Sequence, residues 1–103
     1  MAESTKLSNQ KIKQGLAKLN GWKRDRNVLS KEFTLNSFTG AAKFIAKIAP
    51  IANRMDHHPD LHLHGYKRVK IMLTTHDAGG ITRKDFDLAS KIDALAPPGA
   101  GQA

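Results

Sequence analysis

Cysteine is absent from this sequence, which excludes a disulfide framework and thiolate chemistry. Long hydrophobic runs are also missing, since none approaches the ~20 apolar residues that a membrane-spanning helix needs. The first residues, Met-Ala-Glu-Ser-Thr-Lys, lack the apolar core of a signal peptide. Together these absences predict a cytoplasmic protein without membrane contact, and they leave a nuclear location open.

Acidic residues are scarce in the first half of the chain. The net charge is +8, and all of it lies in residues 1–54, because residues 55–103 hold equal numbers of basic and acidic side chains. A basic patch can contact nucleic acid or an acidic partner. Here, however, the basic residues occur singly or in short groups with few aromatic residues between them. This pattern favours a solvated basic face over nucleic-acid binding.

The length of 103 residues suffices for one hydrophobic core and not for two. We therefore expect a single domain over residues 1–103, with disordered ends near 1–6 and 97–103. The apolar fraction of 40%, arranged with regular periodicity, indicates a folded globule.

Hydrophobic periodicity and capping signals predict seven elements. Ser8 is a suitable N-cap for the first helix and Gly21 a suitable end, while Thr82 and Asp85 resemble the capping box of the last helix. The order α-β-β-α-β-β-α favours an α+β domain, a four-stranded antiparallel sheet with three helices packed on one face. The expected elements are a helix over 7–21, a hairpin over 22–35, a helix over 37–55, a hairpin over 61–73 and a helix from 82 to 96.

The long central helix has an apolar face wider than a surface helix on a small domain needs. We expect one side of it to pack on the sheet and the other on a second copy of the chain, giving a homo-oligomer. Pro50 lies inside this helix and predicts a kink. The stripe comprises Phe38, Ala41, Ala42, Ile45, Ile48, Ala49, Ala52 and Met55, and Phe44 and Ile51 widen it.

All five histidines fall between Asn53 and Asp87. Histidine is the side chain whose ordinary pKa lies nearest neutrality, so such a cluster indicates proton transfer or metal binding. His62, His64 and Asp60 share one face of a strand and could form half of a metal site. The same alternation places these residues opposite leucines, so solvent exposure is their simplest interpretation.

Acid–base catalysis without a metal is the second interpretation. His57 and His58 lie where the long helix ends, and Pro59 disfavours helical geometry at His58. His76 follows the last strand, directly before a glycine-rich loop. If the hairpin folds back, His76 approaches the His57-His58 corner, and two histidines across a pocket can accept one proton and donate another. A third interpretation is that all five are ordinary surface or capping residues.

These motifs together resemble the pterin-4a-carbinolamine dehydratase family. The resemblance rests on His57-His58-Pro59-Asp60, on Tyr66, on the run that ends Leu-Thr-Thr-His76-Asp, and on Gly-Ile-Thr-Arg-Lys-Asp85 with Leu-Ala-Ser after it. Gly21-Trp22 and Lys31-Glu32-Phe33 also fit the family's first hairpin, so the similarity covers nearly the whole chain. Trp22 is interpreted equally well as a core anchor or as a residue at the rim of a pocket.

The resemblance implies a hydro-lyase that assembles as a dimer or tetramer. It would convert a 4a-hydroxytetrahydropterin to the quinonoid dihydropterin plus water, in the recycling of tetrahydrobiopterin, with pterin as substrate and with no cofactor or metal. By this resemblance His57 and His76 form the acid–base pair and His58 binds and orients the pterin. The remaining implied site residues are Pro59, Thr75, Asp77, Ala78 and Trp22 at the substrate and Asp85 in a supporting role.

One position departs from the family pattern. The family usually carries an acidic residue four positions before the first histidine, where this chain has Asn53. Asp56 lies on a neighbouring face of the same turn. Two alternatives follow: Asp56 takes over the role of the acid, or the site works with less help. An alternative function belongs to another class: some animal members act as dimerisation cofactors for a homeodomain transcription factor, which implies a protein partner.

Overall fold

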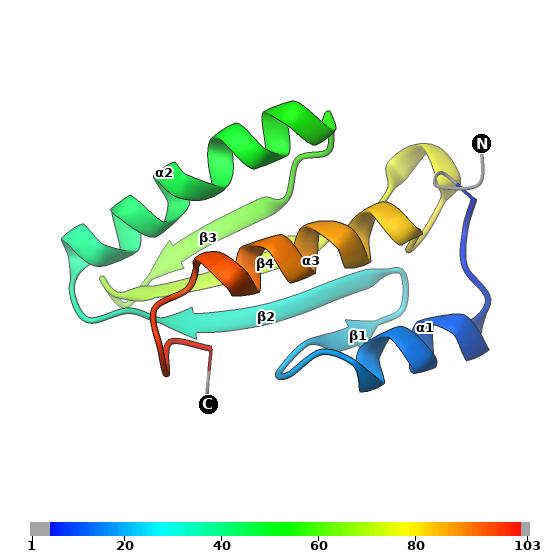
Figure 1. The fold of residues 1–103 in the computed structure, drawn as a ribbon, viewed down its shortest axis with the longest axis horizontal. Coiled ribbons are helices and arrows are strands. Elements are labelled where there is room, and N and C mark those ends of the chain that lie inside the picture. Colours follow the sequence, from blue (N-terminus) through cyan, green and yellow to red (C-terminus); the bar gives the residue numbers. More distant parts are fainter. Residues whose placement is uncertain (1–4, 102–103) are drawn as a thin grey trace.

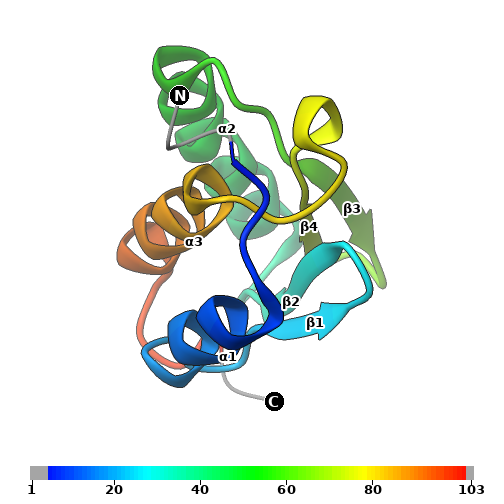
Figure 2. The same cartoon turned by 90° about the vertical axis from the view of Figure 1, so that its right-hand side faces the viewer.

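A computed structural model describes residues 5–101, which form one four-stranded antiparallel sheet with three α-helices on one of its faces (Figures 1 and 2). This confirms the predicted fold and element order. The strands pair in the order β1-β2-β4-β3. The elements are α1 (Asn9–Ala17), β1 (Lys23–Asp25), β2 (Val28–Thr34), α2 (Phe38–Met55), β3 (Asp60–His64), β4 (Arg68–Leu73), the 3₁₀ helix η2 (His76–Ala78) and α3 (Arg83–Leu95).

The two faces of the sheet differ in polarity because side chains alternate along each strand. Leu29 on β2 lies opposite Leu73 on β4, and Phe33 lies opposite Val69; all four are buried beneath the helices. The next residues along β3 and β4 point the other way. His62 and His64 are on this second face, where His62 is exposed and the His64 ring contacts Glu32.

Lys31 is buried on the apolar face of β2, between Leu29 and Phe33 on the same face. Its ammonium contacts a carboxylate oxygen of Asp93 at 2.8 Å and lies 4.7 Å from the centre of the Phe33 ring. The Trp22 indole N–H donates to the other oxygen of Asp93 at 3.0 Å. A buried charge is tolerated when it is paired in this way, and the pair joins β2 to α3.

Both ends of the described chain pack against the fold. In residues 97–101, for which the sequence predicts disorder, Ala100 is buried and its carbonyl accepts from the Thr34 N–H at 2.7 Å. At the other end the Leu7 N–H donates to the Ile81 carbonyl at 2.9 Å. Of the residues for which disorder is predicted, 1–4 and 102–103 fall outside the described residues.

The first helix ends earlier than the sequence predicts. Ser8 caps it as expected, with its hydroxyl accepting from the Lys11 N–H, but α1 stops at Ala17 rather than at Gly21. Lys18 and Leu19 make i→i−3 hydrogen bonds that tighten the last turn. Gly21 has φ +81 in the turn that follows the helix. The glycine at this position therefore allows the turn and does not end the helix.

The buried face of α2 is rotated relative to the apolar face that the sequence predicts. The helix begins at the Ser37 cap and runs through Pro50 without interruption. Its buried residues are Ala41, Phe44, Ile48 and Ala52, while Ala42 and Ala49 are exposed and Phe38 is 59% exposed. One side therefore packs on the sheet and a second apolar side is left uncovered within this chain. Neither α2 nor any other described helix is long and apolar enough to cross a membrane.

Candidate active site

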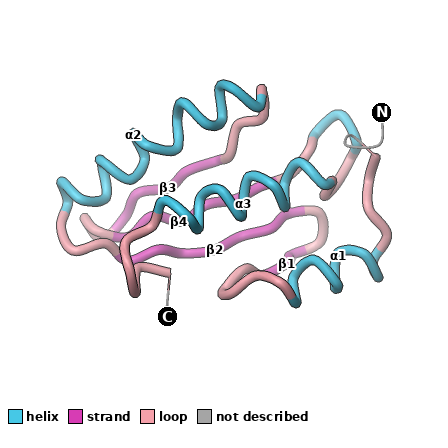
Figure 3. Tube along the Cα trace, viewed as in Figure 1, coloured by secondary structure: helices cyan, strands magenta, loops and turns pink. Residues whose placement is uncertain are grey.

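Three segments of the chain meet at one end of the molecule. They are the end of α2 with the following loop, the loop after β4, and the first turn of α3 (Figures 1 and 3). Between them lies a pocket of about 340 Å³, which is within the usual range for a small-molecule site. Its lining residues are Asp56, His57, His58, Thr74, Thr75, His76, Asp77 and Lys84.

A left-handed residue at the end of α2 turns the chain into the pocket. Asp56 has φ 50 and ψ 43, and its N–H bonds to the carbonyls of Ala52 and Asn53. The His57 N–H then donates to the Ala52 carbonyl at 3.1 Å. This is a common way to end a helix. Its result here is that His57 is buried while the next residue, His58, is exposed.

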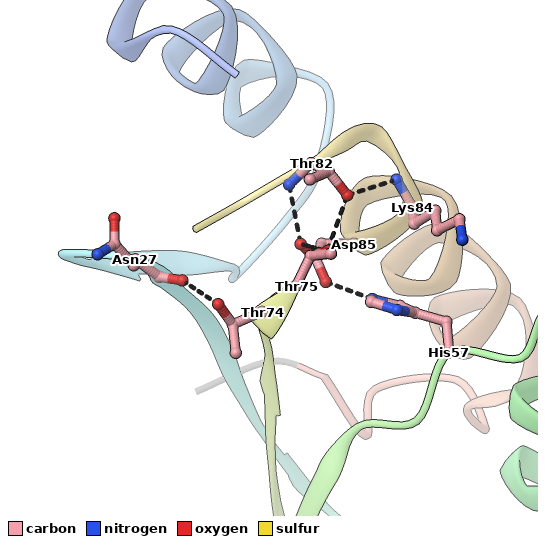
Figure 4. Close-up of polar contacts among 7 residues, drawn as sticks. All are labelled: Asn27, His57, Thr74, Thr75, Thr82, Lys84 and Asp85. Atoms are coloured by element: carbon pink, nitrogen blue, oxygen red, sulfur yellow. Dashed lines mark hydrogen bonds and ion pairs between the residues drawn. The ribbon is translucent and has the colours of Figure 1, made fainter. Parts of the chain in front are cut away.

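His57 is held by a fully buried carboxylate. Its Nε2 lies 2.6 Å from Oδ1 of Asp85, whose exposed fraction is 0%. The other oxygen, Oδ2, accepts from the Thr75 hydroxyl and from the Thr82 N–H, both at 2.9 Å (Figure 4). Burying a carboxylate is unfavourable unless donors surround it. The donors here come from the α2 end, the β4 end and α3, so Asp85 joins all three walls of the site.

This contact fixes the tautomer of a neutral His57 ring. An ionised carboxylate only accepts, so Nε2 carries the proton and Nδ1 has the free lone pair. Among the described residues no buried side-chain nitrogen or oxygen lacks a partner, and no residue hydrogen-bonds to Nδ1. Nδ1 must therefore reach solvent on the pocket side. A histidine held in this way can accept a proton at Nδ1.

A second histidine of the pocket lies in the closed loop that follows β4. Thr75 and Gly80 exchange backbone hydrogen bonds of 3.0 and 3.3 Å, which closes the loop around η2. His76 is the first residue of η2 and is exposed, and its ring makes no hydrogen bond or ion pair with any described residue. Asp77 follows it at the pocket wall. The His76 ring is therefore available to a ligand.

His58 contacts the residue that departs from the family pattern. Its Nε2 lies 3.0 Å from Oδ1 of Asn53, one turn back on α2. Asp56 lines the pocket beside them. The site thus retains a carboxylate near His58, although the group in direct contact with His58 is a neutral amide.

Several predicted site residues lie elsewhere. Trp22 is in the hydrophobic core, bonded to Asp93, and does not line the pocket. Pro59 and Ala78 are half-buried beside the pocket without lining it. Within residues 5–101 no group of three or more potential ligands could hold a metal ion.

Three residues near the pocket were not predicted as part of the site. Thr74 and Lys84 line it. Thr82 lies behind it, bonded to both Thr75 and Asp85. The sequence indicates Thr82 only as a helix cap, and nothing in its local pattern points to the pocket.

Comparison with known proteins gives a consistent result. Residues 5–95 match the family model described as pterin 4 alpha carbinolamine dehydratase. A relative from Sulfolobus acidocaldarius, whose name assigns it provisionally to the pterin-4-alpha-carbinolamine dehydratases, is 46% identical over 90 residues, which cover 87% of this chain and 98% of the relative. A relative with the same name from Thermosynechococcus vestitus is 45% identical over 96 residues, 93% of this chain and 98% of its own.

Solved structures show the same fold. A Brucella melitensis protein titled transcriptional coactivator/pterin dehydratase superposes with a TM-score of 0.86 at 32% identity, covering 90% of this chain and all of its own. A pterin dehydratase-like protein, titled a RuBisCO assembly factor in the α-carboxysome, has a TM-score of 0.59 at 24% identity and covers 73% of this chain and 86% of its own. The second likeness is one of fold alone.

Proposed function

Because this chain belongs to the pterin 4 alpha carbinolamine dehydratase family, we propose that it removes water from a 4a-hydroxytetrahydropterin to give the quinonoid dihydropterin. The proposal includes a role in tetrahydrobiopterin recycling in the cytoplasm, with pterin as substrate and without a cofactor or metal. The observation that carries it is the pairing of a buried, carboxylate-held His57 with an unpartnered His76 in one pocket.

The reaction requires two proton transfers. The bond between C4a and the hydroxyl oxygen breaks as that oxygen receives a proton, and a ring nitrogen of the pterin loses one. His57 is suited to the role of base, because Asp85 holds the proton at Nε2 and stabilises the positive charge that forms when Nδ1 accepts another. His76, in its protonated form, serves as the acid toward the hydroxyl. His58, Thr75 and Asp77 position the pterin between them, with Asp56 in support.

His76→Ala is expected to lower the dehydration rate at least ~10²-fold, because the leaving hydroxyl loses its proton donor. The measurement is turnover of a chemically generated pterin carbinolamine by wild type and variant side by side. His62→Ala is the matched control, since it removes an exposed histidine on the opposite face of the sheet. Wild-type turnover no faster than the uncatalysed reaction contradicts the proposed function. Equal turnover in wild type and His76→Ala contradicts the role of His76.

Asn53→Glu is expected to raise the rate by about fivefold. A hydrogen bond to a charged group is stronger than a neutral one by about 1 kcal/mol, and a carboxylate here would hold His58 more firmly than the amide does. Asn53→Gln is the control, since it has the same length without the charge. A carboxylate near a helix C-terminus costs about 0.5 kcal/mol of folding stability, which thermal unfolding would record. Equal rates in both variants would show that the missing charge has no kinetic effect.

A second candidate function is a role as a protein-binding coactivator. The Brucella melitensis structure carries both descriptions in its title, and the exposed side of α2, with Phe38, Ala42 and Ala49, is an apolar surface suited to a partner or a second copy. We propose a homo-oligomer, a dimer or tetramer, built on this side. Pull-down from cell extract, compared with the turnover assay, separates binding from catalysis.

A further inference from the structure

Behind the pocket, two hydroxyl groups join the end of β4 to the start of α3. The Thr82 hydroxyl lies 2.8 Å from the Thr75 hydroxyl, and the Thr75 hydroxyl lies 2.9 Å from Oδ2 of Asp85 (Figure 4). Thr82 and Asp85 have no exposed surface, and Thr75 is 8% exposed. Neither threonine forms part of the hydrophobic core, and the proposed reaction assigns Thr82 no role.

The direction of each hydrogen bond in this chain follows from counting protons. Each hydroxyl has one proton to donate and can also accept. Thr75 uses its proton toward Oδ2 of Asp85, because an ionised carboxylate cannot donate. The bond between the two threonines must therefore be donated by Thr82. The Thr82 oxygen in turn accepts from the Lys84 N–H at 3.3 Å, which leaves its own proton free to point at Thr75.

Every proton in the network thus points toward Asp85. Oδ2 receives the Thr75 hydroxyl and the Thr82 N–H, and both donors are fixed by buried backbone or side-chain bonds. The remaining oxygen, Oδ1, is left to the Nε2–H of His57. Successive hydrogen bonds of one direction strengthen one another in a buried site.

We propose that Thr82 is a positioning residue for the dehydration reaction. Its buried hydroxyl orders the Thr75 proton and holds the Asp85 carboxylate in place, so that Oδ1 stays within hydrogen-bonding distance of His57 Nε2. That contact keeps the His57 proton at Nε2 with Nδ1 free toward the pocket. This rests on the proposed function for its kinetic consequence, but the tautomer of His57 is a property of the free protein. The capping box that starts α3 (Thr82 with Asp85) has a second role as the support of the base.

Thr82→Val is the decisive variant, since valine has the shape of threonine without its hydroxyl. We expect kcat to fall about fivefold, as befits the loss of one buried hydrogen bond. KM should stay unchanged, because Thr82 does not line the pocket. The ¹⁵N spectrum of His57, recorded without substrate above the pH at which the ring is charged, should show a smaller fraction of the Nε2–H tautomer. Thr82→Ser restores the hydroxyl and should return kcat and the His57 tautomer toward wild type, again with KM unchanged.

Ser37→Ala is the matched control for the loss of a helix cap. The Ser37 hydroxyl caps α2 by accepting from the Gly40 N–H at 2.9 Å, and Ser37 does not line the pocket. Its removal should lower thermal stability without changing kcat or the His57 tautomer. A Thr82→Val protein with wild-type kcat and tautomer would overturn the proposal. So would a Thr82→Ser protein as impaired as Thr82→Val, since the methyl group and not the hydroxyl would then matter.

If Thr82→Val does not fold, the proposal can still be tested on the wild-type protein. The Thr82 hydroxyl proton should exchange slowly enough to be observed by NMR and should show a nuclear Overhauser contact to Thr75. A Thr82 hydroxyl proton that exchanges rapidly with water overturns the proposed chain. Because the tautomer and exchange readouts need no substrate, they remain decisive even if wild type fails to turn over a pterin carbinolamine, which would overturn the proposed function alone.

Discussion

His57→Ala is expected to lower the rate of pterin dehydration by about 10³-fold, within the range that general acid–base catalysis contributes. The variant removes the only pocket histidine whose orientation is fixed by a buried carboxylate, at 2.6 Å from Asp85. His58 cannot take its place, because His58 is exposed and bonded to Asn53. Stopped-flow measurement of carbinolamine decay, with kcat and KM determined separately, tests this.

The fold of this variant must be assessed in parallel, because alanine leaves Oδ1 of Asp85 buried without its donor. An unsatisfied buried group costs about 1–3 kcal/mol, which would appear as a lower thermal midpoint. His57→Gln separates the two effects, since its amide N–H can still donate to Asp85 while offering no basic nitrogen. Both variants should be equally slow, and His57→Gln should be the more stable. A fast His57→Gln protein would contradict the assignment of His57 as base.

Asp85→Asn is expected to lower kcat by about 10²–10³-fold, because it reverses the His57 tautomer. The backbone N–H of Thr82 is a fixed donor and requires an oxygen opposite it. The asparagine oxygen must therefore occupy the Oδ2 position, and its NH₂ group faces His57. Nε2 then has to accept, which moves the ring proton to Nδ1 and removes the lone pair that faces the pocket.

Asp93→Asn is the control for this change, because Asp93 is a second carboxylate on α3 with buried partners, Lys31 and Trp22, and no contact with the pocket. Both variants should lose stability. Only Asp85→Asn should lose activity and show His57 protonated at Nδ1 in the ¹⁵N spectrum. Retention of the Nε2–H tautomer in Asp85→Asn would contradict the role given to this carboxylate.

Local patterns predicted the elements of this fold because the groups that determine them are close in sequence. Ser8 and the Thr82–Asp85 capping box make their hydrogen bonds within three residues, and the alternation of β4 follows from burial of one face. Lys31 could not be placed in the same way. Its partner Asp93 is 62 positions away and the Trp22 bond to Asp93 spans 71, so the burial of a charge at this position is decided by tertiary packing.

The sequence predicted many of the residues of the candidate site, but not the contacts between them. The hypothesis that the second hairpin folds back to the helix end agrees with the pocket, which His57, His58 and His76 line together. The pairing of His57 with Asp85 and the part of Thr82 depend on how α3 docks beside β4, which no spacing encodes. Trp22 had two interpretations of equal weight, and the structure supports that of core anchor.

At Asp56 the local stability of the chain is set against the needs of the proposed site. A residue with φ 50 at the end of a helix is a position where glycine would relieve about 1 kcal/mol of strain. Natural proteins rarely sit at their stability optimum, and the shortfall is commonly found where function needs a particular group. Here the strained residue places a carboxylate at the wall of the pocket. Changing this one residue to glycine would give a more stable protein at the cost of a carboxylate at the wall of the pocket.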